Sequence, residues 1–404
     1  MIKFEMIGKL SANKDSDKFK SYEEKELGSK GWIQRTYKFG VTSGNNHFFL
    51  QSQGGKFKDE SNKIYVFGKG TVDEDGNRKK GEMFTIDFKN RLTDKRLNEV
   101  ADFRKFVFDT EKPGRRWKLK QALEKFEEGT KLDKEELDNL GVKSMDDLQS
   151  ELALSEKRRK EFISAWDYAE YIKRVIDSEK YKDSKFHIYG EYEFQYSESK
   201  GTFYKNYVPQ KIYLADQSEE DRATATVDFY YNEASLDTTS LVDMNKYYVN
   251  GYVRVYDNSR KSDIPAPYTI VIPAAKNESD LEKKREKKQV SRFEVTDGMW
   301  YNYGIVVELL NGSQAEEIKF EDLTEEQQDS ILLGELTLED IQKEMGNYVY
   351  GERITENRFL KPAKGFSKGR QETVYTDEDF EIKALEDENV FEEEESLFDD
   401  DDIL

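Results

Sequence analysis

Aromatic and basic side chains recur with a period of two in the stretch Phe186–Leu214, and their chemistry is ring stacking combined with charge pairing. One parity of the first run carries Tyr192, Phe194 and Tyr196. A second run, 202–208, carries Phe203, Lys205 and Tyr207 on one face. Period-two alternation predicts half-buried strands. Flat rings can stack on planar ligands while a lysine pairs with an anion, so this sheet resembles a platform for stacking bases.

The breaks between these runs predict where the strands that carry these side chains end. The polar segment Ser197–Gly201 predicts a hairpin loop that ends in glycine. Pro209 interrupts the second run, and Lys211–Leu214 resumes extended structure. Both faces of the predicted sheet carry rings, so one face is expected to pack in a core and the other to meet a ligand.

Residues 1–110 predict a first β domain with a similar mixture of rings and cations. Trp32–Val41 alternates as a strand, and the turns SGNN, QGG and DEDGN separate further short strands. Four or five short strands at this spacing are typical of a small barrel or sandwich. The residues that could contact a base or a phosphate in this domain are Trp32, Arg35, Tyr37, Phe39, Phe48, Lys56, Tyr65 and Lys69.

The rest of the chain divides by composition. Helical periodicity over 111–183 predicts a helical connector or insertion. Residues 184–310 predict a second β domain, whose aromatic-basic pattern indicates a structural repeat of the first. Residues 311–350 contain TEEQ and TLED, which predict helix starts. Residues 351–376 are basic and contain glycine, which predicts a flexible arm.

The segment 377–404 is strongly acidic: it holds 15 acidic residues and one basic residue, Lys383. Such blocks repel each other and cannot bury a core, so we expect a disordered tail. Its tip is apolar, because the chain ends in Ile403 and Leu404. An apolar tip can dock in a pocket while the carboxylates meet a basic rim; the alternative is a tail that only solubilises. The expected partner-binding residues are Phe398, Asp399, Asp400, Asp401, Asp402, Ile403 and Leu404.

Composition argues against several classes of function. The 404 residues include no cysteine and two histidines, so neither thiolate nor histidine sites for a metal are expected. No catalytic motif is found, and we expect no catalytic residue, no metal site and no cofactor. No signal peptide and no apolar run of about 18 residues is found, which favours a soluble, cytoplasmic protein. The net charge of -20 resides largely in the tail, so a basic face elsewhere is compatible with it.

Binding of a single-stranded nucleic acid needs cations along a groove and exposed rings, and stacking contributes about 1–3 kcal/mol per base. Aromatic residues in strands most often pack in a core. The chain nevertheless has 24 tyrosines and 25 phenylalanines, too many to be all inward. The candidates in the second β domain are Tyr189, Tyr192, Phe203, Lys205, Tyr207, Lys211 and Tyr213.

Two aromatic-basic β domains followed by an acidic C-terminus that ends FDDDDIL resemble the single-stranded DNA-binding proteins of bacteria and phages. The resemblance implies OB-fold barrels that bind DNA and a tail tip that recruits replication and repair proteins or competes with DNA. The length is closer to a large phage-encoded member, which implies the host cytoplasm. The chain departs from the bacterial form at its tip, Ile403–Leu404 in place of Pro-Phe, and in its helical segments.

The sequence therefore predicts a mainly β, α+β protein: tandem OB-like barrels, a helical connector and a disordered acidic tail. The predicted function is non-enzymatic coating and protection of single-stranded DNA in replication, recombination and repair, with partners recruited by the tail. One alternative is a structural or interaction protein, such as a β-sandwich component of a virion. A second alternative is a metal-dependent nuclease with scattered carboxylates.

Overall fold

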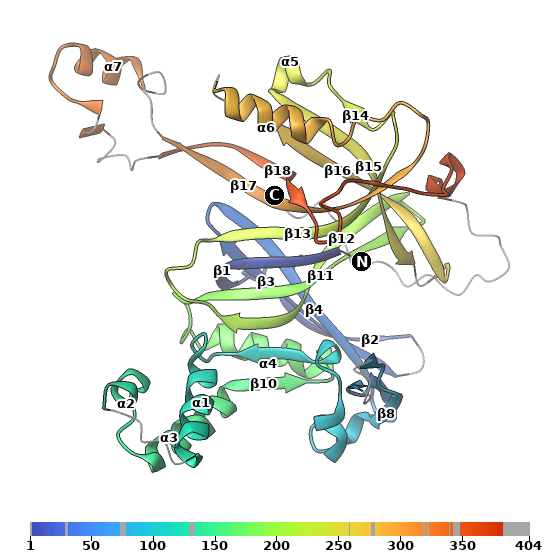
Figure 1. Ribbon diagram of the computed structural model, residues 1–404, viewed down its shortest axis with the longest axis vertical. Helices are drawn as coiled ribbons and strands as arrows, with labels where there is room; N and C mark the ends of the chain where they lie inside the picture. Colours follow the sequence, from blue (N-terminus) through green and yellow to red (C-terminus); the bar gives the residue numbers. More distant parts are fainter. Residues whose placement is uncertain are drawn as a thin grey trace.

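The computed structural model describes residues 2–28, 31–72, 78–128, 134–257, 259–275, 279–317, 320, 323–338, 340–341 and 348–382. A single mixed sheet of 15 strands dominates these residues, which confirms the mainly β class. Figure 1 shows two groups of strands, one above the other, with helices at the outer ends.

The first group, here called the first unit, has five strands whose pairings return to their starting point. These strands are β1 (Ile2–Ala12), β3 (Trp32–Ser43), β4 (Asn46–Phe57), β11 (Lys185–Ser197) and β12 (Thr202–Leu214). β1 pairs with β3, β3 with β4, β12 with β11, and β11 with β1, all antiparallel. β4 and β12 are parallel and meet through the single pair Tyr207 and Leu50. This seam is narrow, so the unit is a curved, incompletely closed sheet.

The second unit repeats this order and sense of pairing. Its strands are β13 (Arg222–Tyr231), β15 (Lys246–Asp257), β16 (Ser262–Pro273), β17 (Tyr301–Glu317) and β18 (Tyr348–Pro362). The parallel seam again joins the third and fifth strands, through Val271 and Arg358. β1 and β13 are antiparallel neighbours, and this pairing joins the two units into one sheet.

Alternation along the strands builds the core of each unit. In β1, Lys3, Glu5 and Lys9 are exposed or half-buried, whereas Phe4 and Met6, on the opposite parity, are buried. In both units a helix lies in the chain between the third and the fourth strand and packs on the unit. In the first unit this helix is α4 (Ala165–Asp177), whose N-cap is Ser164; the Ser164 side chain accepts from the Trp166 amide. α4 buries Tyr168 and Ile172 against the first unit. α6 (Asp280–Val290) packs on β16.

Smaller elements are attached to the five-stranded sheet of the first unit. A helical lobe with its own core, including Leu119 and Leu148, extends from it (Figure 1). Its helices are α1 (Arg115–Glu127), α2 (Lys134–Leu140) and α3 (Met145–Arg158). In the second unit, β14 (Leu236–Asp237) pairs with β15 and β19 (Gln371–Glu372) pairs with β17. The minor strands on the side of the first unit are β2 (Tyr22–Leu27), β5 (Lys63–Phe67), β6 (Thr71–Val72), β7 (Arg78–Lys79), β8 (Met83–Asp87), β9 (Phe106–Asp109) and β10 (Arg159–Phe162). The 3-10 helices on the same side are η1 (Phe88–Asn90), η2 (Lys95–Glu99) and η3 (Asp102–Arg104).

The domain boundary predicted at residue 184 differs from the observed grouping of strands. β11 and β12, which were expected to open a second domain, complete the first unit by pairing with β1 and β4. The second unit begins at β13. Strand alternation is a local signal, whereas the partner of a strand is fixed by contacts far away along the chain, so the sequence pattern did not place this boundary.

Two later segments also differ from the expectation. The helical segment predicted at 311–350 holds one described α-helix, α7 (Glu325–Leu332), at the end of the long β17–β18 hairpin (Figure 1). The predicted arm 351–376 contains most of β18, which pairs along β17, and β19. In the predicted tail, Asp377–Phe380 forms a 3-10 helix, η5, with Phe380 buried, while residues 383–404 lie outside the described residues.

Pro209 does not end the strand as the sequence suggested. β12 continues through it, and the register of the β11–β12 ladder shifts between Tyr189 and Gly190, opposite the proline. A Cβ atom at Gly190 would lie 2.1 Å from the carbonyl oxygen of Val208. Glycine is therefore required at this close approach of two backbones.

Candidate nucleic-acid interface

Four of the predicted contact residues in the first unit lie in its core. Tyr37, Phe39 and Phe48 are at most 1% exposed. Arg35 is also buried: its guanidinium pairs with Glu24 and Glu170. The face of β3 that was predicted to contact a ligand is thus the inward face, and these side chains are not accessible to a ligand in this structure.

The opposite parity of β3 and β4 forms the outer face of the first unit, and the sequence reasoning missed it. Phe49 is 48% exposed, and Lys38, His47 and Gln51 share its face. Lys38 lies opposite Gln51 in the ladder. The ring of Phe19 lies 5.3 Å from the Lys38 amine, and burial lowers the pKa of that amine. The signal was present in the sequence, because Phe49 and Gln51 alternate with the buried residues.

The other predicted residues of this region are scattered. Trp32 packs edge-on against Phe57 and is half-buried. Lys56 forms an ion pair of 2.7 Å with Glu60. Tyr65 and Lys69 are exposed, but Tyr65 belongs to the separate two-stranded sheet β5–β8. The structure does not bring these residues together into one site.

Three predicted residues, Tyr189, Lys211 and Tyr213, do gather on the outer face of β11 and β12. The rings of Tyr189 and Tyr213 are 6.1 Å apart, and Tyr189 lies opposite Lys211 in the ladder. Desolvation raises the pKa of both tyrosines, so both stay neutral. Carboxylates border this group, since Glu219 lies 2.6 Å from the imidazole of His187. A phosphate is disfavoured beside such a carboxylate.

Tyr192, Tyr207 and Phe203 are mainly structural. The rings of Tyr192 and Tyr207 stack 4.5 Å apart, and Tyr207 also meets Phe4 and Phe48 edge-on. Burial raises the pKa of Tyr192 to about 12. Phe203 is half-buried and packs against the core.

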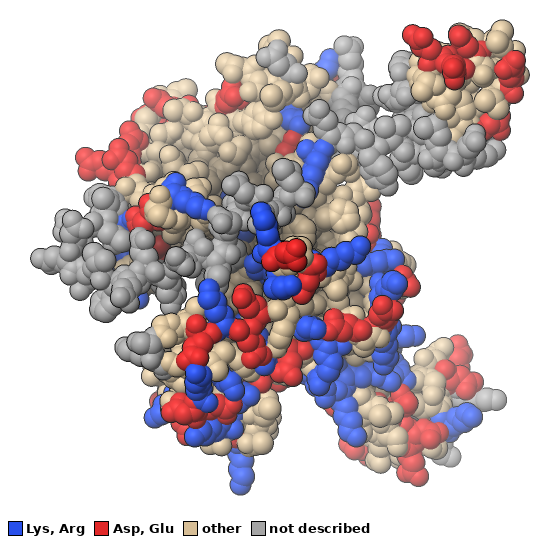
Figure 2. Space-filling model, turned by 180° about the vertical axis from the view of Figure 1, so that it is seen from behind, with Lys and Arg blue, Asp and Glu red and all other residues tan. Residues whose placement is uncertain are grey.

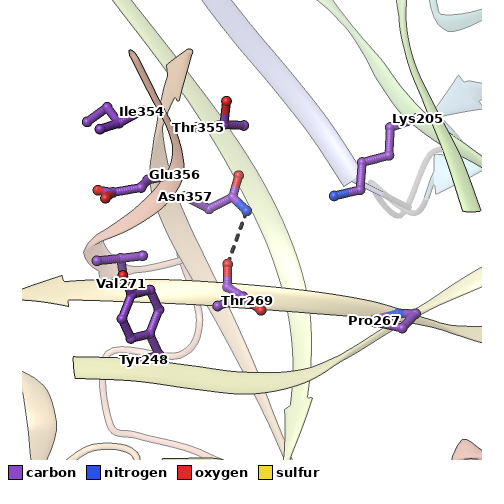
Figure 3. A pocket seen from close by; sticks show the side chains of 9 residues that line it. All are labelled: Lys205, Tyr248, Pro267, Thr269, Val271, Ile354, Thr355, Glu356 and Asn357. Carbon is purple, nitrogen blue, oxygen red and sulfur yellow. Dashed lines mark hydrogen bonds between the residues drawn. The ribbon is translucent and has the colours of Figure 1, made fainter. Parts of the chain in front are cut away.

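Lys205 stands apart from these rings because it faces a hollow of about 530 Å³ between the two units. Figure 3 shows its amine reaching toward the hollow from β12, across from residues of β16 and β18. The lining residues are Lys205, Tyr248, Pro267, Thr269, Val271, Ile354, Thr355, Glu356 and Asn357. The Asn357 amide donates to the carbonyl oxygen of Thr269 at 3.1 Å, which ties β18 to β16 at the floor.

The electrostatics of the hollow favour an anion near Lys205. The lining contains the carboxylate of Glu356. Lys246 and Arg358 both pair with this carboxylate, Arg358 at 3.0 Å, so its negative charge is compensated. Lys205 is exposed at the rim, yet the protein around it displaces water and lowers the pKa of its amine. A phosphate that approaches this amine would favour its charged form and so oppose the lowering of its pKa.

A row of tyrosines on β15 continues from the hollow, and the sequence reasoning missed it as well. Tyr248, Tyr252 and Tyr256 lie at every fourth position, so all three point to the outer face of the strand. Tyr256 is 58% exposed. Arg254 lies on the same face, between the last two tyrosines. The spacing was visible in the sequence, but the choice of face depends on which side packs in the core.

Charge on the surface is mixed. The back of the molecule shows Lys and Arg gathered in its lower half, interspersed with Asp and Glu (Figure 2). Across the described residues, no group of three or more metal-ligating side chains is found. Within the same residues, no helix is both long and apolar enough to cross a membrane.

Comparison with solved structures finds low-scoring matches to a single-stranded DNA binding protein. No protein-family model and no curated protein matches the chain. The wild-type single-stranded DNA binding protein from Thermus aquaticus matches with a TM-score of 0.27 and 9% identity, over 77% of this chain and 85% of that chain. A deletion and substitution mutant of the same protein matches with a TM-score of 0.25 and 8% identity, over 77% and 87%. Scores this low carry no argument about this chain.

Proposed function

We propose that this protein binds single-stranded DNA along the outer face of β15 and β16 and through the hollow that Lys205 faces. The observation that carries the proposal is the row of Tyr248, Tyr252 and Tyr256, which runs from the hollow along one strand. Rings in a row stack on successive bases without regard to sequence, and a cation across the groove pairs with the backbone.

The pairing order of the strands supports this placement. An OB fold is a five-stranded, partly open Greek-key barrel that binds oligonucleotides on its second and third strands and on the loops that flank them. We infer that both units are barrels of this type. In the second unit the second and third strands are β15 and β16, and in the first unit they are β3 and β4. Phe49 and Lys38 then supply a second contact surface on the first unit.

The role we infer is binding without catalysis. A protein of this kind coats and protects single-stranded DNA during replication, recombination and repair in the cytoplasm, as in the phage proteins that the sequence resembles. The acidic segment 383–404 would recruit partner proteins through its tip, Phe398 to Leu404, in which four aspartates lie between apolar residues.

Titration with oligo-dT while tyrosine and tryptophan fluorescence is recorded tests the proposal. The expected result is quenching that salt reverses and that needs no metal ion, because phosphate contacts release counterions. Duplex DNA of the same length is the control and should bind more weakly. Absence of any response at low salt would sink the proposal. Metal-dependent degradation of the oligonucleotide would favour a nuclease instead.

A further inference from the structure

The outer surface of the second unit carries a cage of rings that is filled by a residue from the C-terminal segment. Phe380 is 6% exposed and stacks on Trp300 with the ring centroids 3.8 Å apart and the planes at 22°. Tyr252 and Tyr230 complete the cage at 5.2 and 5.8 Å from the Phe380 ring. These are outward-facing positions of β15 and β13, so Phe380 lies on the outside of the unit and not in its core.

Short elements hold the segment that brings Phe380 there, and Thr373 donates two hydrogen bonds to the carbonyl oxygen of Trp300. The two-residue strand β19 pairs with β17, and the indole nitrogen of Trp300 donates to Asp377 at 2.8 Å. Arg254 donates to the carbonyl oxygen of Asp379 at 3.3 Å, and its guanidinium lies 4.6 Å from the ring of Tyr375. A four-residue 3-10 helix and a short ladder are a modest anchor, and such elements open at low free energy.

The cage lies on the same path as the hollow. Tyr252 is the ladder partner of Pro267, which lines the hollow, and Tyr248 is on the hollow side of Tyr252 along β15. A strand of DNA that stacks on Tyr248 and follows β15 therefore arrives at Tyr252 and the cage. The next outward residue, Arg254, would be released for a phosphate if the segment left.

We propose that the cage of Trp300, Tyr252 and Tyr230 is a nucleobase subsite, which Phe380 fills when DNA is absent. This inference rests on the proposed function. A base and a phenyl ring are both flat, and either can stack on an indole face. The carboxylates of Asp377, Glu378 and Asp379 travel with Phe380 and repel a polyanion. The DNA and the segment consequently exclude each other at this site.

Substitution of the occupant is the direct test. In Phe380→Ala the cage is open, so oligo-dT should bind about five- to tenfold more tightly, at the lower end of the range that one stacked ring provides. Adding Trp300→Ala to that variant should abolish the gain. Phe366→Ala is the matched control, because Phe366 is half-buried in the same C-terminal part of the chain and packs beside Tyr303, away from the cage. It should leave the affinity unchanged.

A second measurement on the unmodified chain guards against variants that lose their fold. Amide hydrogen exchange over residues 371–380 should become faster when oligo-dT saturates the protein, because the segment is displaced. The inference is overturned if the folded Phe380→Ala variant binds as the wild type does, or if exchange in this segment is unchanged or slower. Failure of the wild type to bind oligo-dT would instead overturn the proposed function itself, so the two outcomes are distinguishable.

Discussion

The guanidinium of Arg35 lies 3.8 Å from the ring of Trp166, and its nitrogen Nη1 pairs with Glu170 at 2.7 Å. Trp166 and Glu170 belong to α4, whereas Arg35 belongs to β3. This contact ties the helix to the sheet at the end of the first unit. Arg35 is therefore a residue of the scaffold, although its place among aromatic residues in the sequence is equally compatible with a phosphate contact.

Replacing Arg35 by alanine should lower the free energy of unfolding and leave DNA binding unchanged. We expect a loss of about 1–3 kcal/mol, because the stacked guanidinium is buried while its carboxylate partners stay partly exposed and can be hydrated. Urea unfolding measures the change. A folded Arg35→Ala protein that binds oligo-dT with a reduced salt dependence would show that this arginine does contact phosphates.

Replacing Lys205 by alanine should weaken oligo-dT binding and reduce its salt dependence. One phosphate contact on a single strand contributes about 0.7 to the slope of log affinity against log salt concentration. The slope, measured between low and moderate salt, should fall by roughly this amount. Lys200→Ala, a change on the neighbouring hairpin turn, is the control and should alter the slope less. An unchanged slope in Lys205→Ala would remove the hollow from the proposed DNA path.

The lowered pKa of Lys205 predicts a dependence of binding on pH. The charged amine binds phosphate, and desolvation lowers its pKa from the ordinary value of 10.5. The charge is thus lost as the pH rises, earlier than for an exposed lysine, and the affinity should decline in the alkaline range below pH 10.5. Lys205→Arg keeps its charge at these pH values and should flatten the profile. Identical profiles for the two proteins would contradict this assignment.

Replacing Tyr248 by alanine should weaken binding of oligo-dT, since one stacking ring contributes about 1–3 kcal/mol. Tyr65→Ala is an informative comparison, because Tyr65 is more exposed but lies on the separate two-stranded sheet β5–β8. The proposed path predicts a large effect for the first substitution and a small one for the second. The reverse order, measured by fluorescence titration, would move the binding site to the two-stranded sheet.

Two truncations should separate the roles of the C-terminal segment. Removal of 383–404 takes away acidic residues but keeps Phe380, and we expect equal or modestly higher DNA affinity together with loss of partner recruitment. Removal of 377–404 also empties the cage and should raise the affinity further. Oligo-dT titration of both proteins at one salt concentration tests this order. A large loss of affinity in either protein would contradict the proposed role of the segment.

Some features of the fold follow from the sequence alone. Alternating side chains in Phe186–Leu214 and Trp32–Val41 predict strands, and these are β11, β12 and β3. Local signals suffice here, because the period of a strand and the glycine of a hairpin turn are properties of neighbouring residues. Helix capping is local in the same way, since the side chain of Ser144, just before α3, accepts from the Asp147 amide.

Tertiary structure decided which face of each strand is buried and which strands are neighbours. β15 carries tyrosines on both parities, so period alone does not tell Tyr247, which packs against the core, from Tyr248, on the outer face. β11 joins β1 across 176 to 190 positions of the chain, from Lys9–Lys185 to Ile2–Tyr192, a pairing that no local pattern records. The cage around Phe380 arises in the same way, from rings on β13 and β15 and from Trp300 just before β17. Composition indicated that rings and cations are present, and only the packing of distant strands determined which of them reach the surface together.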